Sequence, residues 1–188
     1  VADMENSHKG QGREAALQAA RDHIYTGKLG QKIVAYNREM GGLLTEEDLA
    51  RYHVQISSPV SVNYRGYDVY STGPWGQGPP FPQALKILEG FDLASMGHNS
   101  VEYIHTVSQA LNLAFADREK YVGDPDFVDV PIDELLSERY LAERRSLIDP
   151  GLAWPGTPPA GDPRSGRATF DGENQSPNEA LVPDGTSG

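Results

Sequence analysis

A loop rich in glycine and proline, "GPWGQGPP" at residues 73–80, is the stretch of this sequence that first points to ligand chemistry. Glycines let backbone N–H groups approach an anion where a helix begins, so such a loop can hold a phosphate group. The spacing gives neither G-x-x-x-x-G-K-[ST] nor a properly placed G-x-G-x-x-G. Pro79, Pro80 and Pro82 also remove three N–H donors from the place that the anion would occupy. The pattern argues against phosphate binding.

Two interpretations of this loop stay open. In the first, it is a rigid connector that turns a strand into a helix. In the second, it forms one wall of a site for another ligand, with Trp75 as a flat apolar surface and Gln77 as a hydrogen-bond donor. Trp75 and Gln77 are therefore the candidate substrate-binding residues.

Carboxylates gather at two other places. Asp124, Asp126 and Asp129 in "GDPDFVDV" are oxygen ligands of the kind that Ca²⁺ binds, but the glycine and the bidentate Glu of an EF-hand are missing, and Asp-Pro favours a turn. In "ADREKY", Asp117 and Glu119 alternate with basic residues. Such a pair can do acid–base work, but alternating charges are typical of an exposed helix face or a structural ion pair, which we favour.

No pattern identifies a nucleophile or a metal centre. The chain has no cysteine and no G-x-S-x-G motif, so thiolate chemistry, disulfides and Cys-ligated metals are excluded. The five histidines form neither H-E-x-x-H nor an i, i+4 pair: His8, His23, His53, His98 and His105. From the residues alone we assign no catalytic residue, no metal and no cofactor.

The charge balance narrows the range of partners. The 188 residues include 27 acidic and 16 basic side chains, a formal net charge of −11, which repels phosphate backbones and anionic membrane surfaces. We predict no nucleic-acid partner and, because no apolar run approaches the roughly 20 residues that cross a bilayer, no membrane insertion. The compartment stays unknown. Because the first residue is Val1, we expect a piece of a longer protein.

Helical periodicity organises the first part of the chain. We predict helices over residues 13–27 and 28–41, each ended by a glycine, with a left-handed cap at Gly27. Their apolar residues in register are Leu17, Ala20 and Ile24 in the first and Leu29, Ile33, Tyr36 and Met40 in the second. A capping box of Thr45 and Asp48, with a staple of Leu44 and Leu49, predicts a short helix over residues 46–51.

The period then changes to two. The run "PVSVNYRGYDVYS" predicts a β-hairpin that turns at Arg65-Gly66. A helix over residues 82–89 follows, then a longer helix capped by Ser100 and a last helix starting at Ser137. The inner face predicted for the longer helix is Ile104, Val107, Leu111, Ala114 and Phe115; the last helix carries Tyr140, Leu141 and Leu147.

These elements predict an α-rich α+β fold, with helical segments around one β-hairpin. A lone hairpin is marginal in water, so we expect its strands to join a sheet that other sequence supplies. Residues 1–149 are interpreted as the α-rich domain. Residues 150–188, rich in Pro, Gly, Ser and Asp, are interpreted as an extended or disordered tail.

Three stretches together resemble the gamma-glutamyltranspeptidase family, in the later half of its large subunit: "GGLLTEEDLARYHVQISSPVSVNYRGYDVYSTGP", "QALKILEGFDL" and "AFADREKYVGDPDFVDVP". The similarity covers about residues 25–149. The resemblance implies a four-layer αββα fold of N-terminal-nucleophile hydrolases. It also implies a precursor that cuts itself, exposing a Thr that attacks the γ-glutamyl carbonyl of substrates such as glutathione; water, an amino acid or a peptide then accepts the glutamyl group.

The same resemblance implies that the catalytic groups lie elsewhere. The family's Thr-Thr-His-like start of the small subunit would follow Gly188, and Thr186 does not match it. The arginine that binds the donor's α-carboxylate would precede Val1. We therefore expect a scaffold segment, inactive alone, whose partners are the small subunit and the earlier half of the large subunit, and whose tail leads to the processing site.

One departure from the family affects specificity. Many members carry a Pro-rich Ser-Ser-Gly-Gly loop where this chain has "GPWGQGPPF", so Trp75 and Gln77 leave the donor and acceptor open. Two alternatives remain: a related acylase that cleaves an amide such as a β-lactam side chain, or a non-catalytic interaction module. The isolated chain is expected to be marginally stable or to self-associate through its hairpin edge.

Overall fold

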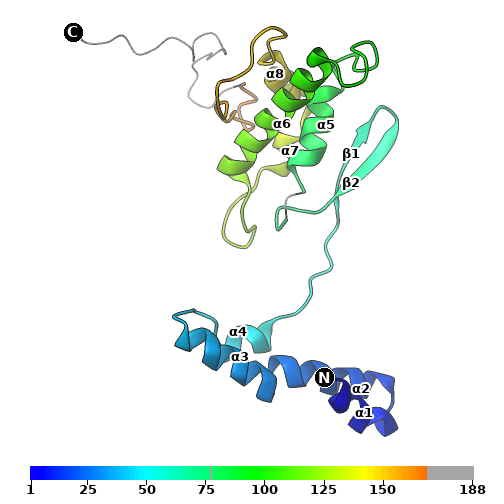
Figure 1. The fold of residues 1–188 in the computed structure, drawn as a ribbon, viewed down its shortest axis with the longest axis vertical. Coiled ribbons are helices and arrows are strands. Elements are labelled where there is room, and N and C mark those ends of the chain that lie inside the picture. The colour runs from blue at the N-terminus through cyan, green and yellow to red at the C-terminus, as the bar shows by residue number, and fades with distance from the viewer. Residues whose placement is uncertain (77, 169–188) are drawn as a thin grey trace, which may run out of the picture. The chain divides into compact units, whose positions relative to one another are not determined.

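The computed structural model describes residues 1–76 and 78–168. The chain divides into two compact units, Val1–Ile56 and Ser57–Gly188, and each is described by itself (Figure 1). Among the described residues, no helix has both the length and the apolar character that crossing a bilayer requires.

The first unit is helical. Its elements are α1 (Ala2–His8), the 3₁₀ turn η1 (Lys9–Gln11), α2 (Arg13–Tyr25), α3 (Lys28–Glu39) and α4 (Glu46–Arg51). Small side chains, Ala16, Ala20 and Val34, fill its buried positions. The rings of Tyr25 and Tyr52 stack with centroids 5.5 Å apart, which joins the end of α2 to the residue that follows α4.

The predicted helix ends are correct at one glycine and wrong at the other. Gly41 has a φ of +80°, the left-handed conformation that glycine tolerates best. Gly27 is extended, with a φ of −93°, and is the N-cap of α3 rather than a left-handed cap of α2. The chain turns so tightly here that a Cβ on Gly27 would lie 2.9 Å from the Cα of His23. The close approach of the backbone at residue 27 to His23 explains why this residue is glycine.

The capping box and the short helix behind it are confirmed. The Thr45 hydroxyl accepts the Asp48 N–H at 3.1 Å, and the Asp48 carboxylate accepts the Thr45 N–H at 2.8 Å. Hydrogen bonds from the Thr45 hydroxyl and then from its N–H lower the pKa of Asp48. The staple of Leu44 and Leu49 stays a prediction.

The predicted apolar face of α3 is largely exposed. Ile33, Tyr36 and Met40 are 41%, 64% and 68% exposed, whereas Val34 is buried. The stripe is present in the sequence as predicted, but within this unit α3 packs through its smaller side chains.

The second unit begins with the predicted hairpin, which is confirmed. Strands β1 (Val60–Tyr64) and β2 (Tyr67–Ser71) pair antiparallel, with Val62 opposite Val69. Arg65 and Gly66 have φ values of 50° and 87°, so both central residues adopt the positive φ of a type I′ turn. The described residues contain this one two-stranded sheet.

The helices that follow among the described residues are α5 (Pro80–Leu88), α6 (Val101–Tyr121), α7 (Ile132–Leu135) and α8 (Glu138–Ser146). The side chain of Ser100 caps α6 as predicted, and the last helix begins where expected, with the side chain of Ser137 as the cap of α8. Helix α5 begins two residues earlier than expected. The core lies where α5, α6 and α8 meet (Figure 1). Its buried members are Ile87, Leu88, Ala110, Leu113, Leu141 and Ile148.

The inner face predicted for α6 is mostly wrong. Ile104, Leu111 and Phe115 are 52%, 38% and 43% exposed, and Ala114 alone of the predicted face is fully buried. The buried face instead consists of Thr106, Gln109, Ala110, Leu113, Ala114, Ala116 and Asp117. Its small residues let α5 approach closely, so the bulkier stripe is left outside.

Residues 150–168 belong to the second compact unit, which begins at Ser57. This segment contains no helix and has only isolated bridges, Asp149 with Leu152 and Asp162 with Arg167. It is packed rather than loose, since Trp154 and Ala168 are each 7% exposed. The rest of the predicted tail, residues 169–188, lies outside the described residues.

Candidate functional site

The loop between β2 and α5 is a tightly fixed connector. The Ser71 hydroxyl donates to the Gly78 carbonyl at 3.0 Å, and the Gly76 N–H donates to the Gly73 carbonyl at 3.2 Å. A Cβ on Gly78 would lie 1.8 Å from the Thr72 carbonyl oxygen, so only glycine fits there. The close approach to Thr72 explains Gly78 without a bound anion.

Trp75 lies on the outside of this connector and is 53% exposed. Its neighbour Pro74 lines an open surface pocket together with the loop after α6, through Pro125, Phe127, Val128, Asp129 and Val130. The connector and that loop therefore border one open depression, lined by apolar side chains and by Asp129. Gln77, the other predicted binding residue, lies outside the described residues.

The acidic loop forms the turn that its Asp-Pro pair predicts. The Asp124 carboxylate accepts the Asp126 N–H at 2.9 Å, and the Asp124 carbonyl accepts the N–H groups of Phe127 and Val128. Over residues 1–76 and 78–168, no group of three or more His, Asp or Glu side chains is placed to hold a metal ion. Asp124 thus acts on the backbone of its own loop.

Asp117 is the centre of a buried polar cluster. Its side chain and that of Arg144 are both 0% exposed and form an ion pair at 3.1 Å. The other carboxylate oxygen accepts hydrogen bonds from the Gln83 amide at 2.6 Å and the Tyr140 hydroxyl at 2.7 Å. The Gly161 N–H donates to the first oxygen at 2.9 Å. Both oxygens of Asp117 are fully engaged, as a buried carboxylate requires.

Arg144 connects this cluster to the segment that follows α8. Its guanidinium group donates to three backbone carbonyls, those of Leu113 at 3.0 Å, Pro159 at 2.9 Å and Ala168 at 2.7 Å. The Nε atom of Arg144 is buried without a hydrogen-bond partner in the described part of the chain. Arg144 therefore connects α8 both to α6 and to the backbone of residues 159 and 168, in the segment that follows α8.

The two tyrosines near this cluster are hydrogen-bond donors rather than acid–base groups. Burial, followed by the nearby Asp117 carboxylate, raises the pKa of Tyr140 well above its ordinary value. Burial, followed by the charge of Asp162, raises the pKa of Tyr121 to about 12, and its hydroxyl donates to the Gly161 carbonyl at 2.7 Å. Both hydroxyls thus keep their protons at neutral pH.

The sequence left an exposed helix face and a structural ion pair open for Asp117 and Glu119. In the structure Asp117 forms a buried ion pair with Arg144, and Glu119 pairs with Arg118 at the surface. Sequence reasoning missed the cluster because it placed the wrong face of α6 inward. The available signal was that Asp117 shares a helix face with Ala110 and Leu113.

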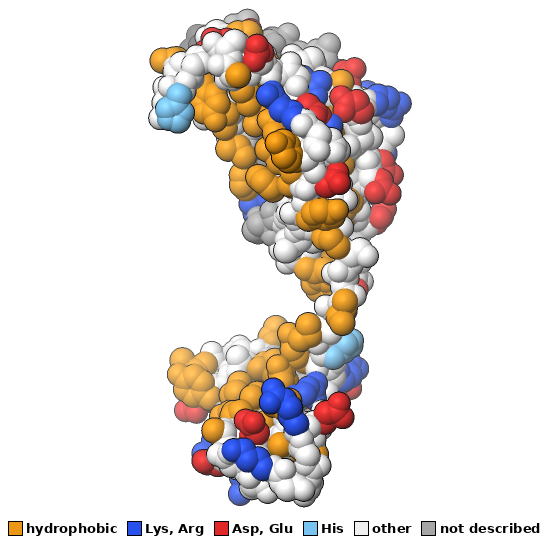
Figure 2. Space-filling model, turned by 90° about the vertical axis from the view of Figure 1, so that its right-hand side faces the viewer, with side chains coloured by type: hydrophobic (Ala, Val, Ile, Leu, Met, Phe, Trp, Pro, Cys, Tyr) orange, Lys and Arg blue, Asp and Glu red, His pale blue; other side chains and the backbone are white. Residues whose placement is uncertain are grey.

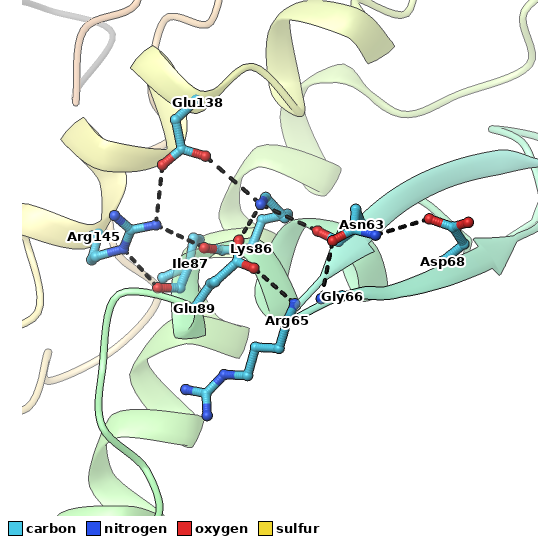
Figure 3. A network of polar contacts seen from close by, with 9 residues as sticks. All are labelled: Asn63, Arg65, Gly66, Asp68, Lys86, Ile87, Glu89, Glu138 and Arg145. Atoms are coloured by element: carbon cyan, nitrogen blue, oxygen red, sulfur yellow. Dashed lines mark hydrogen bonds and ion pairs between the residues drawn. The ribbon is translucent and has the colours of Figure 1, made fainter.

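A second polar network fastens the hairpin turn to α5 (Figure 3). The Glu89 carboxylate accepts the Arg65 N–H at 2.9 Å and pairs with the Lys86 ammonium group, which also donates to the Asn63 carbonyl at 3.3 Å. The contact with Lys86 and then the N–H of Arg65 lower the pKa of Glu89.

Arg145 joins the same region to α8. It donates to the carbonyls of Ile87 and Lys86 at 2.8 Å each, and Glu138 lies 3.7 Å from its guanidinium group (Figure 3). Among the described residues, two arginines of α8 therefore act as anchors. Arg145 binds α5 next to the hairpin, and Arg144 binds the backbone of residues 159 and 168. Neither has the groups of a nucleophilic centre.

Comparison with known proteins identifies the family. The family model described as gamma-glutamyltranspeptidase matches residues 14–179. The acylase ACY 1 proenzyme of a Pseudomonas species is 40% identical over 129 residues, covering 68% of this chain and 23% of that protein. The glutathione hydrolase proenzyme of Escherichia coli is 36% identical over 170 residues, covering 90% of this chain and 29% of that protein.

Solved structures give the same assignment. The cephalosporin acylase of Bacillus halodurans superposes with a TM-score of 0.70 at 37% identity, covering 83% of this chain and 28% of that one. The gamma-glutamyltranspeptidase of Helicobacter pylori superposes with a TM-score of 0.67 at 28% identity, covering 93% of this chain and 47% of that one. The chain thus spans less than a third of the length of the two curated relatives.

Proposed function

This chain belongs to the gamma-glutamyltranspeptidase family, and from that membership we propose that it is a scaffold segment of an enzyme that cleaves γ-glutamyl amides such as glutathione. The enzyme transfers the glutamyl group to water, an amino acid or a peptide. The observation that carries the proposal is the family match over residues 14–179, supported by the 90% of this chain that aligns with a glutathione hydrolase proenzyme.

In this proposal the chain supplies architecture and the rest of the protein supplies the reacting groups. The most buried titratable groups among the described residues, Asp117 and Tyr140, are locked in structural hydrogen bonds. The nucleophilic Thr then comes from the small subunit, and the carboxylate-binding arginine from the earlier half of the large subunit. Both are the partners that this segment packs against.

The proposal is tested by expressing the full-length protein that contains this chain. We expect it to split into two subunits, to release p-nitroaniline from γ-glutamyl-p-nitroanilide, and to hydrolyse glutathione. The isolated 188-residue chain is the control and is expected to show no activity. A full-length protein that stays uncut and inactive on every amide tested would instead support a non-catalytic interaction module.

A related acylase activity is the second candidate. Both an acylase proenzyme and a cephalosporin acylase structure match this chain at 40% and 37% identity. The connector sequence around Trp75 also departs from the Ser-Ser-Gly-Gly pattern that many gamma-glutamyltranspeptidases carry. Measuring kcat/KM for a γ-glutamyl amide and for a cephalosporin with an acyl side chain separates the two, because the preferred class has the higher value.

We also propose that Trp75 lies at the approach to the active site of the assembled enzyme. Its indole is half exposed, and the preceding residue, Pro74, lines the depression between the connector and the loop after α6. An exposed flat aromatic surface of this kind contributes apolar contact area to a ligand. The role of Gln77 stays a prediction from the sequence.

A further inference from the structure

The segment after α8 runs along α6. The Trp154 N–H donates to the Gln109 side chain at 3.3 Å, and the Gly161 N–H donates to the Asp117 carboxylate at 2.9 Å. Gln109 and Asp117 both belong to the buried face of α6, and Asp117 lies nearer to its C-terminal end. The segment and the helix therefore advance in the same direction. We call residues 154–168 the strap.

The strap has little regular structure of its own. It contains no helix, and its isolated bridge joins Asp162 to Arg167. It is nevertheless packed, because Trp154 and Ala168 at its two ends are each 7% exposed. Ordering a residue costs conformational entropy, so a segment without helix or sheet needs contacts from other elements to stay in place.

The Asp117–Arg144 ion pair supplies such contacts. Asp117 accepts the Gly161 N–H at 2.9 Å. Arg144 donates to the carbonyls of Pro159 at 2.9 Å and Ala168 at 2.7 Å. All three hydrogen bonds reach the backbone of the strap, so they hold its path whatever side chains it carries.

The dependence between the strap and the ion pair is mutual. Both charged side chains are 0% exposed, and a buried charge is tolerated only when its hydrogen-bonding groups have partners. The strap provides part of those partners, one N–H for Asp117 and two carbonyls for Arg144. Partial detachment would leave buried polar groups unpaired, which costs more than the lost hydrogen bonds alone. The strap is therefore favoured either fully closed or fully open.

One glycine fixes the register of the strap. The Gly161 carbonyl accepts a hydrogen bond from the Tyr121 hydroxyl at 2.7 Å, so both polar backbone groups of this residue are bound. A Cβ at Gly161 would lie 2.2 Å from the Tyr140 hydroxyl oxygen, whereas a Cβ at Gly156 would meet no described atom within 4 Å. Of these two glycines of the strap, only Gly161 is required for lack of space.

We propose that residues 154–168 open and close as one unit, separately from the helices beneath them, and that the Asp117–Arg144 pair is the latch that holds the closed state. Proteins open locally in contiguous cooperative units of this kind. The inference goes beyond the proposed function and holds whichever substrate the enzyme cleaves.

Adjacent arginines of α8 provide a matched test in the full-length protein. Arg144→Lys keeps the positive charge opposite Asp117 but loses the planar group that binds two strap carbonyls. Arg145→Lys makes the same change in a side chain whose hydrogen bonds go to Lys86 and Ile87 on α5. Amide hydrogen exchange is followed by mass spectrometry, at a temperature where circular dichroism shows folded protein.

Arg144→Lys is expected to speed exchange about 10- to 100-fold in the peptides that contain Trp154 and Gly161, the range for loss of hydrogen bonds to a charged group. Both peptides should change by a similar factor, because the strap opens as one unit. Exchange in α5 should stay at the wild-type rate. Arg145→Lys should leave the strap at the wild-type rate.

A pair of glycine variants tests the strap without changing a charge. Gly161→Ala places a methyl group against the Tyr140 hydroxyl and is expected to open the whole strap, whereas Gly156→Ala is expected to leave its exchange unchanged. This pair gives the answer if Arg144→Lys does not fold.

Three results would overturn the inference. Equal strap exchange in the Arg144 and Arg145 variants, or in the two glycine variants, would remove the latch. Faster exchange near Gly161 with Trp154 still protected would show fraying instead of one cooperative unit. Equal acceleration in α5 would show that the whole fold opens. Each readout is independent of catalysis, so failure of the proposed function leaves this test intact.

Discussion

At the scale of single residues, the fully buried carboxylate of Asp117 is kept away from acid–base chemistry. Asp117 is surrounded by four donors, and Arg144 neutralises its charge. A carboxylate that accepts this many hydrogen bonds has no free lone pair for a substrate proton. Burial here indicates a structural role.

We expect Asp117→Ala to lower the free energy of unfolding of the full-length protein by about 3–5 kcal/mol, because it leaves Arg144 buried without its counter-charge. Glu119→Gln, two residues on in the same helix, is the control. Its side chain is 65% exposed and pairs with Arg118 at the surface, so its loss costs within about 0.5 kcal/mol. Urea unfolding measures both. Equal losses of unfolding free energy in the two variants would contradict the structural role of Asp117.

Trp75 gives a kinetic prediction. In the full-length enzyme, Trp75→Ala should raise KM by about tenfold with kcat nearly unchanged, as expected when an apolar wall binds substrate and transition state alike. Stability should change little, because the indole is 53% exposed. Phe81→Ala is the matched control, since Phe81 is 51% exposed in the first turn of α5. Unchanged kcat and KM in Trp75→Ala would show that Trp75 does not contribute to substrate binding.

At the scale of elements, the hairpin is held by its turn. Glu89 near the end of α5 accepts the N–H of Arg65, the first residue of the type I′ turn, and Lys86 reaches back to Asn63 (Figure 3). A two-stranded hairpin is marginal by itself, so this attachment to a packed helix sets its position.

The hairpin anchor should be sensitive to acid. Lys86 and the Arg65 N–H hold the pKa of Glu89 below its ordinary value of 4.5. A carboxyl whose pKa is lower in the folded state stabilises the fold above the unfolded pKa, and this stabilisation is lost as pH falls through the folded pKa. Melting temperatures of the full-length protein between about pH 7 and about pH 3 should therefore fall more steeply for wild type than for Glu89→Gln. Parallel curves would contradict the anchor.

Helix α6 shows why an element's inner face is hard to read from periodicity. Its sequence carries a bulky stripe, with Ile104, Leu111 and Phe115, and a second stripe of small residues around Ala110. Both stripes recur at helical spacing. Because larger side chains are usually buried, the sequence favoured the bulky stripe as the inner face, which is wrong. The structure packs the small stripe against α5, where close approach buries more of the backbone.

At the scale of the whole molecule, each unit exposes hydrophobic side chains (Figure 2). In the second unit Ile104, Leu111 and Phe115 are at least 38% exposed, and the hairpin is a two-stranded sheet. Contiguous apolar surface and unpaired strand edges favour association.

We therefore expect the isolated chain to self-associate or to be marginally stable. Size-exclusion chromatography with light scattering should show species larger than the 20.5 kDa monomer, and melting should be broad or early. Phe115→Ser is expected to shift the distribution toward monomer, because it removes an exposed apolar contact from α6. A monomer with a sharp, high melting transition would refute this expectation.

The sequence by itself determined the local structure and the family. The capping box at Thr45, the turn at Arg65-Gly66, the cap at Ser100 and the Asp-Pro turn all follow from interactions within a few residues, and the sequence predicts each of them correctly. The motifs quoted from residues 41–131 also sufficed to indicate the gamma-glutamyltranspeptidase family, which the comparisons confirm.

Only the tertiary structure decided the long-range partners. Asp117 meets Arg144, and through it Pro159 and Ala168, because α6, α8 and the final segment converge in space. The inward face of α6 and the extended Gly27 depend in the same way on which surfaces approach each other. Pairing across such separations is set by packing of the whole unit, which local propensity does not specify.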